Sequence, residues 1–171
     1  MAFGPRIRTI VFAALLAVSL LLAGCFSSAG GTTTTGAPAP DFSGVTLDGE
    51  QVSLSDYRGK PVVIVFMASW CGPCRAESPE IDRFYQENKD RAVLLAVVVS
   101  DSEADIRAFM SENDLTFPVM LDGDSAANAY GVSAIPTTVI VDSEGRIAKK
   151  LIGGTTADAL SQIVDGLAGT S

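Results

Sequence analysis

A pair of cysteines placed between a buried strand and a helix constrains this chain more than any other feature. Residues 61–68 (PVVIVFMA) are almost continuously apolar and rich in β-branched side chains, which is typical of a strand buried on both faces. The sequence SWCGPC follows directly, and residues 73–88 then carry apolar side chains at helical spacing. Cys71 and Cys74 therefore stand where a strand ends and a helix begins. Two cysteines so spaced can hold a metal, close a loop or exchange electrons with another protein.

The pattern from residue 41 onward predicts one domain in which strands and helices alternate. Residues 45–54 predict a hairpin that turns at Asp48-Gly49, because this dipeptide accepts positive φ angles. We expect a second buried strand over 92–100, and then an amphipathic helix that begins at Asp101 or Ser102. The segments that follow are strand 117–121, helix 124–131, strands 137–142 and 146–154, and helix 157–169. The order indicates an α/β fold whose sheet is covered by helices on both faces.

Two details of this domain are also expected from the sequence. Pro79 falls inside the helix that follows the cysteines, where a proline removes a backbone hydrogen bond and favours a kink. Four phenylalanines are interpreted as core residues: Phe66, Phe84, Phe109 and Phe117.

The charge and composition exclude several classes of function. The chain has 12 Lys and Arg against 20 Asp and Glu, a formal net charge of −8, and no basic run. This charge disfavours nucleic acids and anionic lipid headgroups as electrostatic partners. Histidine is absent, which removes the usual general base and the commonest nitrogen ligand for metals.

The N-terminus carries the features of an export signal. Arg6 and Arg8 precede an apolar stretch over residues 10–23, which is shorter than the about 20 residues that a membrane span needs. The sequence LAGC that ends at Cys25 resembles the bacterial lipobox, which implies a lipidated Cys25; the alternative is a chance cysteine at an ordinary cleavage site. Residues 26–40 are rich in Gly, Ser, Thr and Pro and predict a flexible tether.

These observations predict three parts of the chain. Residues 1–24 form a lipoprotein signal peptide, residues 25–40 the lipidated cysteine and its tether, and residues 41–171 the folded domain. The expected location is extracytoplasmic, with the protein anchored by lipid to a bacterial membrane.

The context of the cysteine pair favours redox chemistry. Cys71 is expected at the N-terminus of a helix, where free N–H groups and the helix dipole stabilise a thiolate, and Cys74 is expected one turn inward and shielded. Cys71 can then attack a disulfide, and Cys74 can resolve the mixed disulfide that forms. No metal or cofactor is needed. A structural bridge would close too small a loop to constrain the unfolded chain, and a zinc site would need two further ligands.

On these residues the chain resembles the thioredoxin superfamily, and within it the TlpA/ResA-like (AhpC/TSA-Redoxin type) extracytoplasmic thiol-disulfide oxidoreductases. The matching segments are residues 37–74 and GVSAIPTTVIVDSEGRI over 131–147. The resemblance implies a thioredoxin-like three-layer α/β/α fold with an N-terminal β-hairpin. It also implies a central helix-strand insertion over residues 101–121.

The resemblance further implies which residues meet a substrate. The bond before Pro136 is expected to be cis, with the Ile135 backbone beside the cysteines and able to pair with an extended partner segment. Trp70 is interpreted as a shield of the site, with core packing as the alternative. Gly72 and Pro73 form the dipeptide found in thioredoxin, which favours a reducing potential.

The chain departs from thioredoxin at one position near the cysteines. Thioredoxins carry a buried Asp six residues before the first cysteine, and here that residue is Val65. Glu77 matches a Glu that ResA-like proteins place near their cysteines, so it is a candidate to shuttle the proton of Cys74. The alternative is an ordinary solvated carboxylate.

The prediction that follows is a monomeric, membrane-anchored reductant of protein disulfides. Its substrates would be protein thiols and disulfides, apocytochrome c among them, and its electrons would come from a membrane donor of the CcdA/DsbD kind. Two alternatives belong to other classes. A peroxiredoxin-type thiol peroxidase would need a PxxxTxxC pattern, and a Sco-like copper chaperone would need CxxxC and a distal histidine; the chain has neither.

Overall fold

A five-stranded mixed sheet forms the centre of the domain. The computed structural model describes residues 34–121 and 123–168, and the chain is discussed over these ranges. All six residues of the central strand β3 (Val62–Met67) are buried, as the apolar run predicts. The strands lie in the order β5-β4-β3-β6-β7. On one side of β3, β4 (Val93–Val98) pairs parallel with β3, and β5 (Val119–Met120) pairs parallel with β4. On the other side, β6 (Thr137–Val141) pairs antiparallel with β3, and β7 (Ile147–Ile152) pairs antiparallel with β6.

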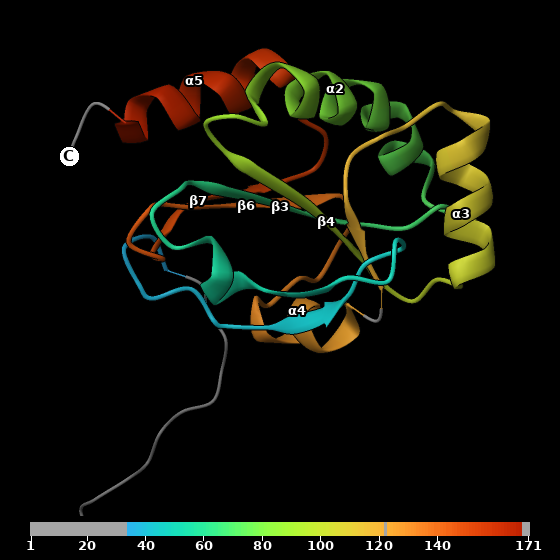
Figure 1. Ribbon diagram of the computed structural model, residues 1–171, viewed down its shortest axis with the longest axis horizontal. Helices are drawn as coiled ribbons and strands as arrows, with labels where there is room; N and C mark the ends of the chain where they lie inside the picture. Colours follow the sequence, from blue (N-terminus) through green and yellow to red (C-terminus); the bar gives the residue numbers. More distant parts are fainter. Residues whose placement is uncertain (1–33, 122, 169–171) are drawn as a thin grey trace, which may run out of the picture. The chain divides into compact units, whose positions relative to one another are not determined.

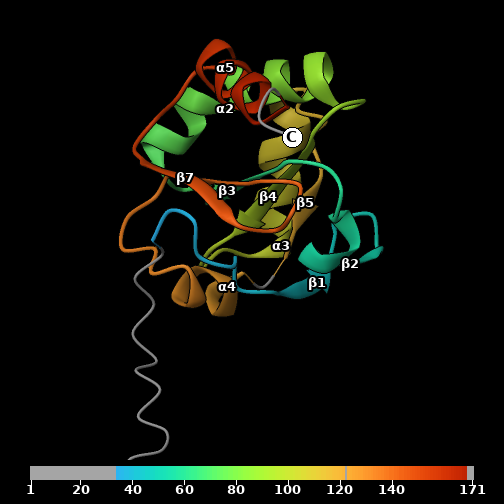
Figure 2. The same ribbon diagram turned by 90° about the vertical axis from the view of Figure 1, so that its left-hand side faces the viewer.

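Helices cover both faces of this sheet, which confirms the three-layer expectation. Figures 1 and 2 both show α2 (Gly72–Asn88) and α5 (Ala157–Ala168) together on one face and α4 (Asp124–Ala129) on the other. The apolar side chains of α3 (Glu103–Glu112) join the cluster under α2 and α5. α2 is a single helix that continues through Pro79.

The predicted hairpin and insertion are both present. Strands β1 (Ser43–Val45) and β2 (Gln51–Ser53) pair around a turn in which Gly49 has a φ of 85°, and a 3-10 helix, η1 (Leu54–Tyr57), follows. The hairpin contacts β5 through the backbone bond from Leu47 N–H to the Val119 carbonyl, 2.9 Å. The insertion consists of α3 and β5. Of the two candidate caps for α3, Ser102 is the one used, because its side chain accepts a hydrogen bond from the Asp105 N–H.

The N-terminal boundary of the domain differs from the prediction. Residues 36–39, which we assigned to the tether, run along β7: the Gly36 N–H donates to the Ile147 carbonyl at 2.8 Å, and the Ala39 N–H to the Gly145 carbonyl at 2.9 Å. Ala39 is buried. The folded domain therefore begins near residue 36 rather than 41. The composition did not reveal this, because these contacts use backbone groups that any residue supplies.

The remaining predictions for the N-terminus concern residues 1–33. The signal peptide over 1–24, lipidation of Cys25 and the first part of the tether all lie outside the described residues. Across residues 34–121 and 123–168, no helix combines the length and the apolar character needed to cross a bilayer.

Two apolar clusters, one on each face of the sheet, form the core. Phe84, Phe109 and Phe117 are buried on the α2 face and Phe66 on the α4 face, as predicted. Tyr130, which follows α4, is 0% exposed and packs against the rings of Phe42 and Phe66, with centroids 6.0 and 5.6 Å away. Its hydroxyl donates a hydrogen bond to the Pro40 carbonyl at 2.8 Å. This bond ties the N-terminal segment to the core.

Replacing this hydroxyl should destabilise the fold. We expect Tyr130→Phe to lower the free energy of unfolding by about 1 kcal/mol, because the half-buried Pro40 carbonyl loses its donor. Urea unfolding followed by circular dichroism would measure the change. Tyr85→Phe is the matched control, since Tyr85 is a half-buried tyrosine on the opposite face of the sheet. Equal stability of the Tyr130→Phe variant and the wild type would contradict the role given to this bond.

Candidate active site

The cysteine pair lies where β3 leads into α2. Cys71 is the N-cap of α2, in an extended conformation with φ −81° and ψ 109°, and Pro73 supplies the preset φ that favours the first turn. The Cys71 Sγ accepts a hydrogen bond from the Cys74 backbone N–H at 3.3 Å. The two residues are joined in a disulfide, with their Cα atoms 5.2 Å apart. The predicted junction of strand and helix is confirmed.

Cys71 and Cys74 differ little in exposed fraction in this oxidised state. Cys71 is 5% exposed and Cys74 is 2% exposed. Cys74 is shielded, as expected. Cys71 is also buried, and only slightly more accessible than Cys74. Gly72 and Pro73, between them, are both exposed.

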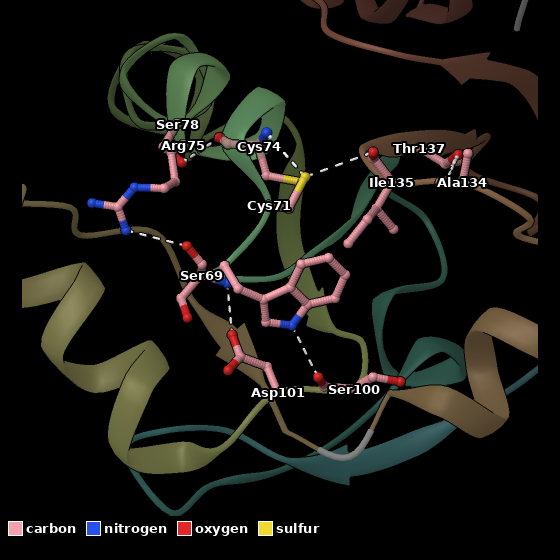
Figure 3. Close-up of a disulfide and its surroundings, with 11 residues drawn as sticks. Ser69, Cys71, Cys74, Arg75, Ser78, Ser100, Asp101, Ala134, Ile135 and Thr137 are labelled. Atoms are coloured by element: carbon pink, nitrogen blue, oxygen red, sulfur yellow. Dashed lines mark hydrogen bonds between the residues drawn. A yellow bond between two sulfur atoms is a disulfide. The ribbon is translucent and has the colours of Figure 1, made fainter.

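A second segment, distant in sequence, reaches the same point. The Ile135-Pro136 peptide bond is cis, as the resemblance implied. The carbonyl oxygen of Ile135 lies 3.7 Å from Cys71 Sγ and points toward it (Figure 3). Pro136 is buried and Ile135 half-buried. The backbone of Ile135 and the sulfur of Cys71 are thus presented side by side.

Trp70 stands on the surface next to Cys71. Its side chain is 63% exposed, and its Nε1–H donates to the Ser100 carbonyl at 3.0 Å. The alternative of core packing is therefore wrong for this residue. A groove of about 450 Å³ extends from Trp70 toward α3, with Arg75, Asp105 and Glu112 among the residues that line it.

Two charged residues that the sequence did not mark as part of the site fix the loop before the cysteines. The backbone N–H of Ser69 donates to Asp101 Oδ2 at 2.6 Å, and the Ser69 carbonyl accepts from Arg75 Nη1 at 3.2 Å (Figure 3). The Arg75 guanidinium lies 4.8 Å from the ring centroid of Phe109, a favourable cation–π distance. Asp101 had been considered only as a helix cap, and Arg75 carries no sequence signal.

Glu77 is buried one helical turn after Cys74. It is 6% exposed, so the alternative of a solvated carboxylate is wrong. Burial raises the pKa of this carboxyl to about 7, and the Thr155 N–H, which donates to Oε1 at 2.9 Å, partly opposes that rise. Val65, at the position of the thioredoxin Asp, is also buried. Glu77 is therefore a buried acid on the cysteine-bearing face of α2.

This arrangement suits thiol-disulfide exchange. The helix N-terminus stabilises a thiolate at Cys71, and the second cysteine is within bonding distance to displace a partner from it. Within the described ranges, no three His, Cys, Asp or Glu side chains gather as a metal ion would require.

Comparison with known proteins places this geometry in a family. The sequence model of the AhpC/TSA family matches residues 35–150. The chain belongs to the AhpC/TSA family. Among its relatives, thioredoxin-like protein YneN of Bacillus subtilis (strain 168) is 40% identical over 133 residues, which are 76% of this chain and 78% of YneN. Thiol-disulfide oxidoreductase ResA of Geobacillus thermodenitrificans is 33% identical over 163 residues, 94% of each chain.

A solved structure shows the same fold. The exposed lipoprotein thioredoxin Etrx1 of Streptococcus pneumoniae superposes with a TM-score of 0.68 and 35% identity, covering 75% of this chain and 100% of Etrx1. The thioredoxin-like fold is thereby confirmed. The protein is a thiol-disulfide oxidoreductase, with Cys71 and Cys74 as its cysteine pair.

The raised pKa of Glu77 predicts how stability varies with pH. The folded protein holds this proton up to about pH 7, whereas an ordinary carboxyl releases it near 4.5. The folded state therefore binds more protons between these values, so this contribution to stability is fully present below pH 4.5 and is lost as the pH rises through about 7. Glu77→Gln should flatten this decline, and urea unfolding at a series of pH values would measure it.

Glu87→Gln provides the control for this titration. Glu87 lies on the same helix and is exposed, so its replacement removes a carboxylate from α2 without altering a buried site. If the curve of the Glu77→Gln variant runs parallel to that of the wild type from pH 4 to 8, Glu77 does not titrate as described.

Proposed function

We propose that the protein is a membrane-anchored, extracytoplasmic reductant of protein disulfides. The observation that carries the proposal is the position of Cys71, which caps the N-terminus of α2 with its sulfur 3.7 Å from the Ile135 carbonyl. The exposed Trp70 precedes Cys71 in sequence, and Cys74 follows in the first turn of α2 and is buried. An extended polypeptide can reach Cys71 there, with Trp70, Gly72, Pro73, Ile135 and Pro136 as the surface it contacts.

The reaction proceeds in two exchanges. The Cys71 thiolate attacks one sulfur of the substrate disulfide, a Cys71–substrate disulfide forms, and the other substrate sulfur leaves as a thiolate that takes up a proton. Cys74 then gives up its proton and attacks Cys71 Sγ, which releases the second substrate sulfur. Two electrons pass from the cysteine pair to the substrate, and the Cys71–Cys74 disulfide is the product on the protein.

Glu77 is the proposed acceptor for the proton of Cys74. It follows Cys74 by one turn on the buried face of α2, and its pKa of about 7 is suited to exchange a proton near neutral pH. The Thr155 N–H holds the carboxyl in place from the segment before α5. Val65 offers no acid at the position thioredoxin uses, so Glu77 takes over that task.

The direction of electron flow is inferred from the dipeptide between the cysteines. Gly72-Pro73 is the thioredoxin pair, whose couple has a potential of about −270 mV, far from the about −120 mV of a strong oxidant such as DsbA. A reductant working outside the cytoplasm must be reduced again after each turnover. A membrane electron donor of the CcdA/DsbD kind would serve, and apocytochrome c is one candidate substrate.

Trapping the mixed disulfide tests this function. In a Cys74→Ser variant the second exchange cannot occur, so Cys71 should retain its substrate in a disulfide. After expression in the native host and acid quenching, we expect discrete adducts that a thiol reagent releases. Mass spectrometry of the released proteins would identify the substrates.

Two controls make the result decisive. Cys71→Ser should carry far fewer adducts, and equal trapping by both variants would contradict Cys71 as the attacking residue. The potential of the wild-type pair, measured against glutathione, should lie on its reducing side. A potential near that of DsbA would make the protein an oxidase.

Lipid anchoring at Cys25 is a separate part of the proposal. It is supported by the lipobox-like LAGC sequence and by the likeness to Etrx1, which is described as an exposed lipoprotein. We expect Cys25→Ser to release the protein from the membrane fraction or to stall its processing, as cell fractionation and immunoblotting would show. Fractionation and maturation identical to the wild type would exclude the anchor, without bearing on the redox activity.

A further inference from the structure

Thr138 in β6 has a buried hydroxyl without a partner. The residue is 0% exposed, and within the described part of the chain its Oγ1 is the only buried side-chain nitrogen or oxygen that forms no hydrogen bond. The neighbouring Thr137 shows the ordinary outcome, because its hydroxyl donates to the Ala134 carbonyl at 2.7 Å. A buried polar group that is left unpaired destabilises a fold and calls for an explanation.

The hydroxyl lies on the same face of the sheet as the cysteines. Side chains alternate between faces along a strand. Val139 and Val141 belong to the cluster on the α4 face, whereas Ile140 packs in the cluster that contains Cys71 and Cys74. Thr138, two residues from Ile140, therefore points into the layer between the sheet and α2.

Its position along the sheet is fixed by register. Thr138 pairs with Val65 of β3 on one side and with Leu151 of β7 on the other. β6 begins at the end of the sheet where β3 ends, and α2 starts from that same end and runs back over the strands.

Distances along helix and strand then place the hydroxyl near two residues of α2. Distances along α2 and along β6 can be measured from the same point, because Cys71 Sγ lies 3.7 Å from the Ile135 carbonyl. At about 1.5 Å per helical residue, Cys74 and Glu77 lie roughly 4.5 and 9 Å inward from Cys71. Thr138 follows Ile135 by three residues and lies at most roughly 10 Å inward from it at about 3.4 Å per residue, because the cis Ile135-Pro136 segment precedes β6 and is not fully extended. Thr138 is thus no farther inward than about the level of Glu77, and within about one helical turn of Cys74 along the axis of α2.

The bond between Glu77 and Thr155 supports this placement from a third element. Thr155 follows β7, whose last residue, Ile152, pairs with Thr137. The Glu77 carboxyl therefore lies over the ends of β6 and β7 that contain the Thr138–Leu151 pair.

We propose that Thr138 is a positioning residue whose hydroxyl donates a hydrogen bond to Cys74 Sγ once the disulfide is open. The proposal rests on the exchange chemistry of the cysteine pair. When a donor thiolate attacks Cys71 Sγ, the Cys71–Cys74 bond breaks and Cys74 leaves as a thiolate, a much stronger acceptor than a disulfide sulfur. The hydroxyl keeps its own proton; the proton that later neutralises Cys74 comes from Glu77 or from solvent.

This arrangement makes the hydroxyl sensitive to the redox state. It is unpaired in the disulfide form and paired in the dithiol form, so it favours reduction of the pair. It also stabilises the thiolate over the thiol at Cys74, which lowers the pKa of that thiol.

The chain offers an almost isosteric test. Thr138→Val keeps the β-branched shape and removes the hydroxyl, whereas Thr138→Ser keeps the hydroxyl. In a Cys71→Ala background, which isolates Cys74, the rate of alkylation against pH gives the pKa of the Cys74 thiol. Thr138→Val should raise this pKa by about one unit, and Thr138→Ser should leave it close to that of the parent.

The intact pair provides a second readout. Equilibration with dithiothreitol should show Thr138→Val shifted about tenfold toward the disulfide, or about 30 mV more negative, with Thr138→Ser near the wild type. The oxidised Thr138→Val protein should also resist urea at least as well as the wild type, because it no longer buries an unpaired hydroxyl.

The outcomes separate this proposal from the proposed function. Unchanged thiol pKa and potential in Thr138→Val, or equal shifts in the valine and serine variants, would overturn the role of the hydroxyl. Both measurements use small reagents only, so they hold whatever the physiological substrate is. Failure to trap any substrate through Cys71 would overturn the reductant function and leave the result on Thr138 standing.

Discussion

The antiparallel pairing of β3 with β6 is the constraint on which the site depends. It brings Cys71, at the start of α2, against Ile135, which lies just before β6, although the two residues are 64 positions apart in sequence. β3 is buried throughout and its side chains pack in the apolar clusters on both faces, so a shift of its register would disrupt close packing on both sides of the sheet. The approach of the Ile135 carbonyl to Cys71 is therefore fixed by the packing of the whole sheet, and does not rely on the loops themselves.

Local sequence patterns predicted the features that depend only on residues close in sequence. The apolar run of β3, the N-terminal position of Cys71 on α2, a cap of α3 at Asp101 or Ser102 and the buried phenylalanines all follow from residue type and spacing. The burial of Glu77 and the exposure of Trp70 depend on elements that arrive from elsewhere, so single-residue chemistry left them open. The fold name and the cis bond before Pro136 came from the resemblance to a family.

The polar groups near the cysteines differ in how fully they are hydrogen-bonded. Glu77 has one backbone donor and a raised pKa, and Thr138 has an unpaired hydroxyl, whereas Ser69 is bonded on both sides by Asp101 and Arg75. The backbone of the loop before the cysteines is thus fully hydrogen-bonded at Ser69, whereas the layer between α2 and the sheet contains a polar group without a partner. The groups that we propose to exchange a proton, Glu77, and a hydrogen bond, Thr138, both lie in that layer.

Residues 36–39, which run beside the start of β7, show at which end of the sheet the chain enters the domain. These residues bond near Ile147, the first residue of β7, whereas Ile152 at its other end pairs with Thr137 beside the active site. With about 3.4 Å per residue, the two ends of β7 are roughly 17 Å apart. The polypeptide thus enters the domain at the pole opposite the cysteines. Residues 36–39 therefore do not cover the surface around Cys71 that a partner must reach.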